Sequence, residues 1–85
     1  MVVYEIETLL YKERTRKQKV FVRNPTFKGA AEDLLLMLDN FGKLDDVTLC
    51  AILYWGIMED GTHCLLNSWH VSVDQLRLLI SEVVE

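Results

Sequence analysis

Apolar and polar residues alternate along the first part of the chain as expected for β-strands. Residues 2–11 alternate imperfectly, and residues 19–23 form a second, shorter run. The polar segment between the two runs contains no Gly or Asn that would force a tight turn, so the pattern predicts a long β-hairpin. In the first strand, one side is formed by every second residue: Val2, Tyr4, Ile6, Thr8 and Leu10.

A helical period begins after this hairpin. Asn24 is typical of a helix N-cap, and Pro25 is typical of the first helical position. Gly42 is typical of the residue that ends a helix. Between these signals, apolar residues recur at helical spacing on one face: Phe27, Ala30, Ala31, Leu34, Leu38 and Phe41. The sequence therefore predicts an amphipathic helix that starts at Pro25 and stops before Gly42.

A second hairpin is predicted further along the chain. Residues 47–58 form a continuous apolar run rich in β-branched and aromatic residues, which favours a strand. Asp60 and Gly61 follow, and this pair is typical of a two-residue type I′ turn. Residues 63–69 are then the returning strand.

The two-residue turn fixes a register in which Trp55 pairs with Leu66 and Ile52 pairs with Trp69. Alternation then sorts the side chains into two faces, which a slip of one residue would exchange. We expect the more uniformly apolar face to be the core: Leu53, Trp55, Ile57, Cys64, Leu66 and Ser68. The other face mixes apolar and polar side chains: Cys50, Ile52, Tyr54, Gly56, Met58, His63, Leu65, Asn67 and Trp69.

The last element is a helix that begins with a capping box. Ser72 is placed as the N-cap, with Gln75 three residues later. The helix has an apolar stripe: Leu76, Leu79, Ile80 and Val83. The element order is then ββαββα, which predicts an α+β fold with a four-stranded, mainly antiparallel sheet and two helices on one face. Residues 1–85 form a single domain, with a basic hairpin (1–24) and a helix–hairpin–helix body (25–85).

The size and composition of the chain predict self-association. A chain of 85 residues buries only about 60 to 65% of its unfolded surface, so its stability is marginal without a further contribution. Two cysteines provide no disulfide framework, and no metal site or other cofactor is indicated. Because 51% of the residues are apolar, we expect part of this surface to be buried between subunits of a homo-oligomer, most simply a dimer.

The sequence favours the cytoplasm. No segment reaches the roughly 18 apolar residues that a membrane span requires. Glu5 and Glu7 stand where a secretory signal peptide would have a basic start and an apolar run. We therefore expect a cytoplasmic protein with no membrane partner, in which Cys50 and Cys64 are reduced thiols.

Charge is distributed unevenly. The net charge of −4 combines a basic segment, residues 1–28, with an acidic body, residues 29–85. The basic side chains that could bind an anionic partner are Lys12, Arg14, Arg16, Lys17, Lys19 and Arg23. This segment can instead be an ordinary solvated loop, or it can contact the acidic body of another subunit. Nucleic acid is disfavoured because the body is acidic and no aromatic residues interleave with the basic ones.

The mixed face of the second hairpin is a further candidate binding surface. Tyr54 and Trp69 could stack on a ligand, and His63 and Asn67 could donate or accept hydrogen bonds. The same face could also pair with a second copy of itself. The sequence contains no recognisable nucleophile, acid–base pair or phosphate-binding loop, so no catalytic residue is predicted and we expect a protein without enzymatic activity.

Residues 30–85 resemble a class of short uncharacterised phage and prophage proteins. The shared pattern is a Leu-rich helix (AAEDLLLMLDNFG), an apolar strand, an acidic turn with Gly (EDGT), a Ser-Trp pair and a capped last helix. The resemblance implies an accessory protein of the host bacterial cytoplasm that counters host defence. Sequestration of an anionic, nucleotide-like signal molecule is the leading hypothesis. The alternatives are an inhibitor that masks a host defence or regulatory protein, and a structural or assembly component.

Overall fold

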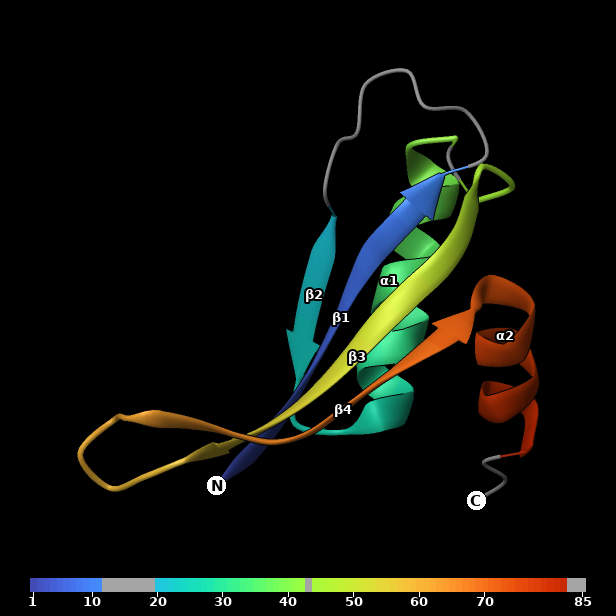
Figure 1. Ribbon diagram of the computed structural model, residues 1–85. Coiled ribbons are helices and arrows are strands. Elements are labelled where there is room, and N and C mark those ends of the chain that lie inside the picture. Colours follow the sequence, from blue (N-terminus) through green and yellow to red (C-terminus); the bar gives the residue numbers. More distant parts are fainter. Residues whose placement is uncertain (12–19, 43, 83–85) are drawn as a thin grey trace.

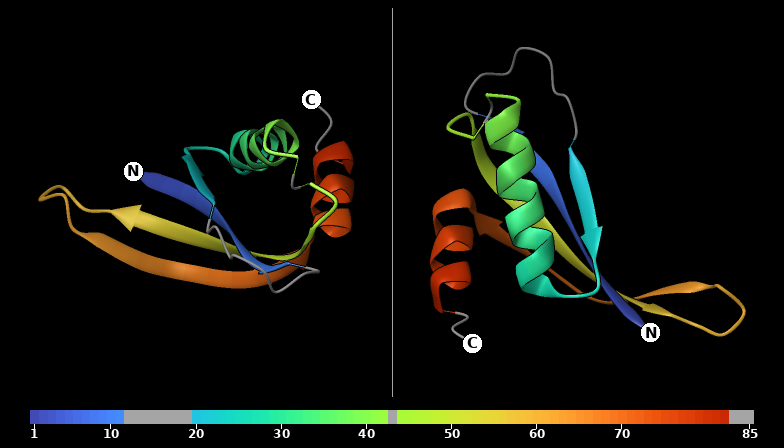
Figure 2. Two further views of the ribbon diagram at one scale, coloured as in Figure 1. Left: turned by 90° about the horizontal axis from the view of Figure 1, so that it is seen from above. Right: turned by 180° about the vertical axis from the view of Figure 1, so that it is seen from behind.

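The computed structural model describes residues 1–11, 20–42 and 44–82, and it confirms the α+β fold with the order ββαββα (Figure 1). The four strands form one antiparallel sheet in the order β2-β1-β3-β4. Both helices lie on the same side of this sheet (Figure 2). The elements are β1 (Val2–Tyr11), β2 (Phe21–Asn24), α1 (Phe27–Asn40), β3 (Val47–Ile57), β4 (His63–Ser72) and α2 (Val73–Glu82).

The core lies between the helices and one face of the sheet. Ile6 of β1 pairs with Ile52 of β3, and both are fully buried. Leu34 of α1 and Leu76 of α2 pack into the same cluster. Neither α1 nor α2 covers the other face of the sheet (Figure 2).

The prediction of which hairpin face forms the core is wrong. Ile52 and Cys50 are buried, whereas Leu53 and Trp55 lie on the uncovered face. Both sides of β3 are apolar, so alternation within β3 does not identify the core side. The missing signal lies in β1, where Glu5 pairs with Leu53 and therefore marks the uncovered side.

A β-bulge changes the register of the second hairpin. Ile52 pairs with Trp69 as predicted, but Trp55 pairs with Leu65, which leaves Leu66 as an extra residue in β4. The predicted two-residue turn is also wrong. The Met58 N–H donates to the Thr62 carbonyl oxygen at 2.9 Å, which encloses a loop of three residues.

The predicted helix starts are partly confirmed. The N-cap of α1 is Thr26, not Asn24: the Thr26 hydroxyl accepts from the Gly29 N–H at 3.1 Å. Asn24 lies two residues earlier, and its side-chain oxygen accepts from the Thr26 N–H at 3.0 Å, so Pro25 precedes the helix. The N-cap of α2 is confirmed, because the Ser72 hydroxyl accepts from the Gln75 N–H at 3.1 Å.

Within the described residues, neither α1 nor α2 is long and apolar enough to cross a membrane.

Candidate functional site

Most of the predicted basic site lies outside the described residues; this applies to Lys12, Arg14, Arg16, Lys17 and Lys19. Arg23 lies on β2 and its side chain is about half exposed. Its Nε donates to the Glu5 carboxylate at 2.6 Å. The charge of Arg23 is therefore held by a carboxylate of its own chain.

Tyr54 belongs to an aromatic cluster on the helix-covered side of the sheet. Its ring centroid lies 4.7 Å from that of Tyr4, the residue with which it pairs across β1 and β3. The Tyr4 ring in turn contacts Phe27 of α1 edge-on, with centroids 5.8 Å apart. These contacts give Tyr54 a packing role between strand and helix.

The other residues of the predicted aromatic face are divided between the two sides of the sheet. Asn67 pairs with Tyr54, and Trp69 is half-buried against the core cluster. His63 pairs with Ile57 after the bulge and lies on the uncovered side, where its ring meets that of Trp55 edge-on at 6.3 Å. The structure thus separates His63 from the three residues with which it was grouped.

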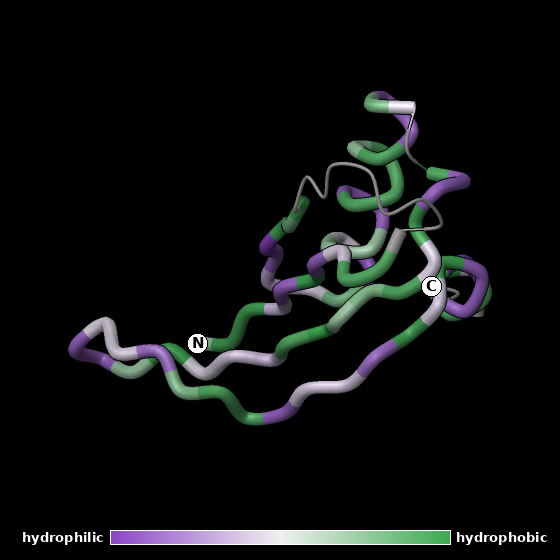
Figure 3. Tube along the Cα trace, turned by 45° about the horizontal axis from the view of Figure 1, so that its top comes forward, coloured by the Kyte–Doolittle hydropathy of each residue, from purple (hydrophilic) through white to green (hydrophobic). Residues whose placement is uncertain are grey.

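The end of the second hairpin forms an arm that extends beyond the helices (Figures 1 and 2). We define this β-arm as residues 55–66. Figure 3 shows apolar positions along both of its strands and a polar tip. The exposed apolar side chains of the arm and of the adjoining start of β1 are Met1, Val2, Met58, Leu65 and Leu66. Alternation along the sequence placed Met58 and Leu65 on the candidate binding face but assigned Leu66 to the core, so it did not delimit this surface.

Trp55 lies at the base of the β-arm between Val3 of β1 and Leu65 of β4. Its indole N–H is shielded from solvent and has no hydrogen-bond acceptor among the described residues. An unsatisfied, shielded donor costs about 1 to 3 kcal/mol relative to a bonded one. An added acceptor at this place would therefore stabilise the protein.

The tip of the β-arm carries its only two carboxylates, Glu59 and Asp60. Hydrogen bonds from the side chain and the backbone N–H of Thr62 hold the pKa of Asp60 below its usual value. The two strands behind the tip contain no Asp, Glu, Lys or Arg. Charge is thus confined to the turn.

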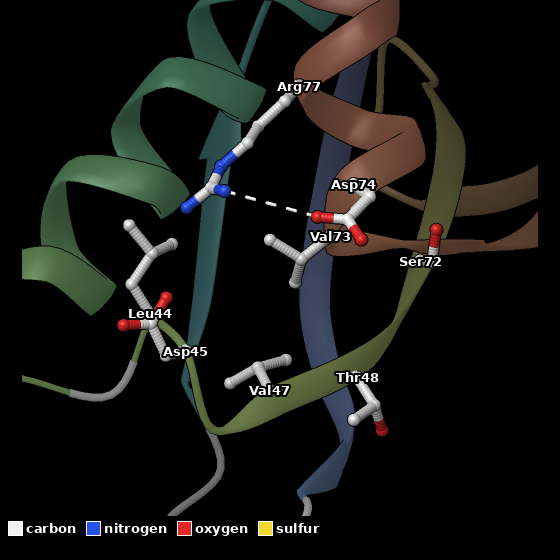
Figure 4. Close-up of a pocket in the computed structure, with 8 residues that line it drawn as sticks. All are labelled: Leu44, Asp45, Val47, Thr48, Ser72, Val73, Asp74 and Arg77. Atoms are coloured by element: carbon white, nitrogen blue, oxygen red, sulfur yellow. Dashed lines mark ion pairs between the residues drawn. The ribbon is translucent and has the colours of Figure 1, made fainter.

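A small pocket lies between the start of β3 and α2 (Figure 4). Its volume is about 220 Å³. Arg77 lies 4.0 Å from Asp74, and the Asp45 carboxylate also lines the pocket, so an anionic ligand would meet two negative groups. No cluster of three or more metal-ligating side chains is present in the described part of the chain. The lining residues are Leu44, Asp45, Val47, Thr48, Ser72, Val73, Asp74 and Arg77.

A larger groove, with a volume of about 460 Å³, lies between the outer edge of β2 and α1. Its walls are mainly apolar, and the side chains of Phe21, Leu36 and Phe41 are more than half exposed. The lining residues are Phe21, Val22, Arg23, Asp33, Leu36, Met37, Asn40 and Phe41. Nothing in the sequence pattern indicated this groove, because its two walls are separated along the chain.

Comparison of the chain with protein-family models, curated proteins and solved structures found no match.

Proposed function

We propose that this chain is a small binding protein that forms a homodimer through its β-arm and, in this form, binds another protein. The supporting observation is the β-arm itself, which exposes apolar side chains such as Met58, Leu65 and Leu66. Several exposed apolar side chains thus gather in one short segment instead of being scattered singly over the surface, which is typical of a protein interaction site. A β-ribbon that extends from the body of a small domain also gains stability when a partner covers it.

A second copy of the chain is the occupant that fits the β-arm. Because the two strands of the arm contain no charged residues, two arms can meet without bringing like charges together. A two-fold contact uses the same patch on both copies and therefore closes into a dimer. Such a contact also adds buried apolar area to a chain that has only a small core.

Protein binding has more support than nucleotide capture. The nucleotide hypothesis requires a base to stack on Tyr54 or Trp69, but Tyr54 packs on Tyr4 and Trp69 packs against the core. Arg23 is paired with Glu5. If the protein is a phage accessory protein, as the resemblance implies, the bound partner would be a host protein that the dimer masks.

The mass in solution tests this proposal. Light scattering of the unmodified protein at high micromolar concentration should give twice the chain mass of 9.9 kDa. Leu65→Lys should give the monomer mass, because it places a charge in the dimer contact without disturbing the core. Leu78→Lys is the matched control, since Leu78 is exposed on α2, away from the arm. A monomeric unmodified protein, or a dimer unaffected by Leu65→Lys, would overturn the proposal.

A further inference from the structure

The groove between β2 and α1 has the features of a site for an extended peptide. We infer that a segment of the protein partner adds to the outer edge of β2 as a fifth strand, with an apolar side chain in the groove and a basic residue beside it. This inference rests on the proposed function only in so far as the partner is a protein. It uses a different edge of the molecule from the β-arm (Figure 1).

The backbone of β2 offers the first half of the site. The Thr8 N–H donates to the Val20 carbonyl oxygen at 2.9 Å, so Val20 and Val22 direct their backbone polar groups toward β1. By alternation, the N–H and C=O groups of Phe21 and Arg23 point outward. They have no backbone partner among the described residues. An added strand is the ligand that satisfies groups with this spacing.

Helix α1 offers the second half. Leu36 and Met37 of α1, together with the C-cap residue Phe41, line the groove that β2 lines from the other side. Leu36 is 61% exposed, although its side chain is large and apolar. A strand laid along β2 would place every second side chain toward this wall, which favours an apolar residue there.

The charge at the rim of the groove indicates the neighbouring residue of the peptide. Asp33 lies on the rim and accepts a hydrogen bond from the Asn24 side chain at 3.3 Å. No cation of the described residues pairs with it, whereas Arg23, the basic residue of the groove, is already paired with Glu5. The uncompensated carboxylate of Asp33 therefore favours a Lys or Arg in the peptide.

The opposite edge of the sheet is less suited to strand addition. The bulge at Leu66 interrupts β4, and the Ser68 N–H donates to the neighbouring Asn67 side chain at 2.9 Å. Bulges and occupied donors are devices that disfavour pairing at a sheet edge. At the edge of β2, by contrast, the outward N–H and C=O groups have no backbone partner within residues 1–11, 20–42 and 44–82, and a groove lies beside them.

Selection from a display library of random twelve-residue peptides tests the inference. The selected peptides should share an apolar residue next to Lys or Arg, and a synthetic copy should shift the NMR amide signals of Phe21 and Arg23. N-methylation of alternate peptide amides should weaken binding about tenfold or more, because it removes strand hydrogen bonds. Asp33→Asn should weaken the binding of basic peptides selectively.

A matched pair of variants locates the site. Leu36→Glu should lower peptide affinity about tenfold or more, because it places a charge in the apolar groove. Leu78→Glu is the control, since Leu78 on α2 is 62% exposed, close to the 61% of Leu36. No selected peptide, or equal binding by the Leu36→Glu variant, would overturn the inference. Because light scattering reports the dimer separately, a dimer that binds no peptide would contradict the groove and leave the β-arm proposal standing.

Discussion

The Nε of Arg23 lies 2.6 Å from the Glu5 carboxylate, and Glu5 is only 8% exposed although it lies on the face of the sheet opposite α1 and α2. The guanidinium of β2 thus shields a carboxylate in the middle of the uncovered face. The pair connects an edge strand to its neighbour through side chains as well as through the backbone.

Arg23→Ala should destabilise the protein by about 1 to 3 kcal/mol, because Glu5 would keep a largely buried charge without its donor. Urea denaturation measures the change. Arg77→Ala removes an exposed pair at 4.0 Å and should change stability by less than about 0.5 kcal/mol. Equal losses of stability in the two variants would contradict the shielding of Glu5 by Arg23.

The effect of Gly29→Ala on stability should change sign when Asn24 is also replaced. A Cβ at Gly29 would lie 2.4 Å from the Asn24 side-chain oxygen, which accepts from the Thr26 N–H before α1. Gly29→Ala should therefore destabilise the protein, even though Ala is favoured over Gly in a helix by about 1 kcal/mol. In an Asn24→Ala background the same change should stabilise it, since the obstacle is gone.

The double-mutant cycle of these two residues is measured by thermal or urea unfolding. Additive effects would contradict the predicted clash.

Gly61 should be needed for its backbone conformation alone. Its φ is +86°, and a Cβ at this position would meet no atom within 4 Å. Gly61→Ala should cost about 1 kcal/mol, and Gly61→Asn should cost less, because Asn tolerates the left-handed region better. Thermal unfolding of the three proteins tests this order; an Ala variant as stable as the parent would exclude the left-handed conformation.

The two cysteines should differ strongly in reactivity. Cys64 is exposed on the β-arm and should react with a thiol reagent in the folded protein. Cys50 is fully buried, and burial raises its pKa to about 11, so it should react only after unfolding. In the Cys64→Ser variant, Cys50 is the only thiol left. Rapid labelling of this variant would contradict the burial of Cys50 in the core.

The buried thiol of Cys50 also gives stability a pH dependence at alkaline pH. Its pKa is raised from 9.0 to about 11, so the unfolded chain loses this proton first. The buried thiol therefore contributes fully to the free energy of unfolding below pH 9. Between about pH 9 and 11 this contribution falls by up to roughly 2 to 3 kcal/mol. The free energy of unfolding should be measured against pH for the unmodified protein and for Cys50→Ala. Subtracting the two curves cancels the titration of all other groups and should show this loss.

Local patterns were sufficient to predict the elements but not the side of the sheet that forms the core. Gly42, with φ +66°, ends α1 as predicted, and Ser72 caps α2 as predicted. The two faces of β3 were exchanged because that strand is apolar on both sides. The alternation of Ile6 with Glu5 in its neighbour β1 resolves this ambiguity, but only once the pairing of β1 with β3 is known.

The candidate sites depended even more on tertiary structure. One extra residue at Leu66 moved His63 away from Tyr54, and sequence periodicity contains no signal for such a bulge. The groove joins Phe21 to Leu36 and Phe41, which belong to different elements. Its existence follows from how α1 lies along the edge of the sheet.

The position of β1 in the sheet has a consequence for folding during synthesis. Val2 pairs with Gly56 and Tyr11 with Val47, so the main ladder joins the beginning of the chain to its second half. In a nascent chain that ends before β3, the short pairing of β1 with β2 is the only pairing of the described sheet that can form. The chain between β1 and β3 must close into a long loop before most of the core can form. Such long-range pairing favours folding in milliseconds to seconds over microseconds. The fold is therefore acquired only after β3 has left the ribosome.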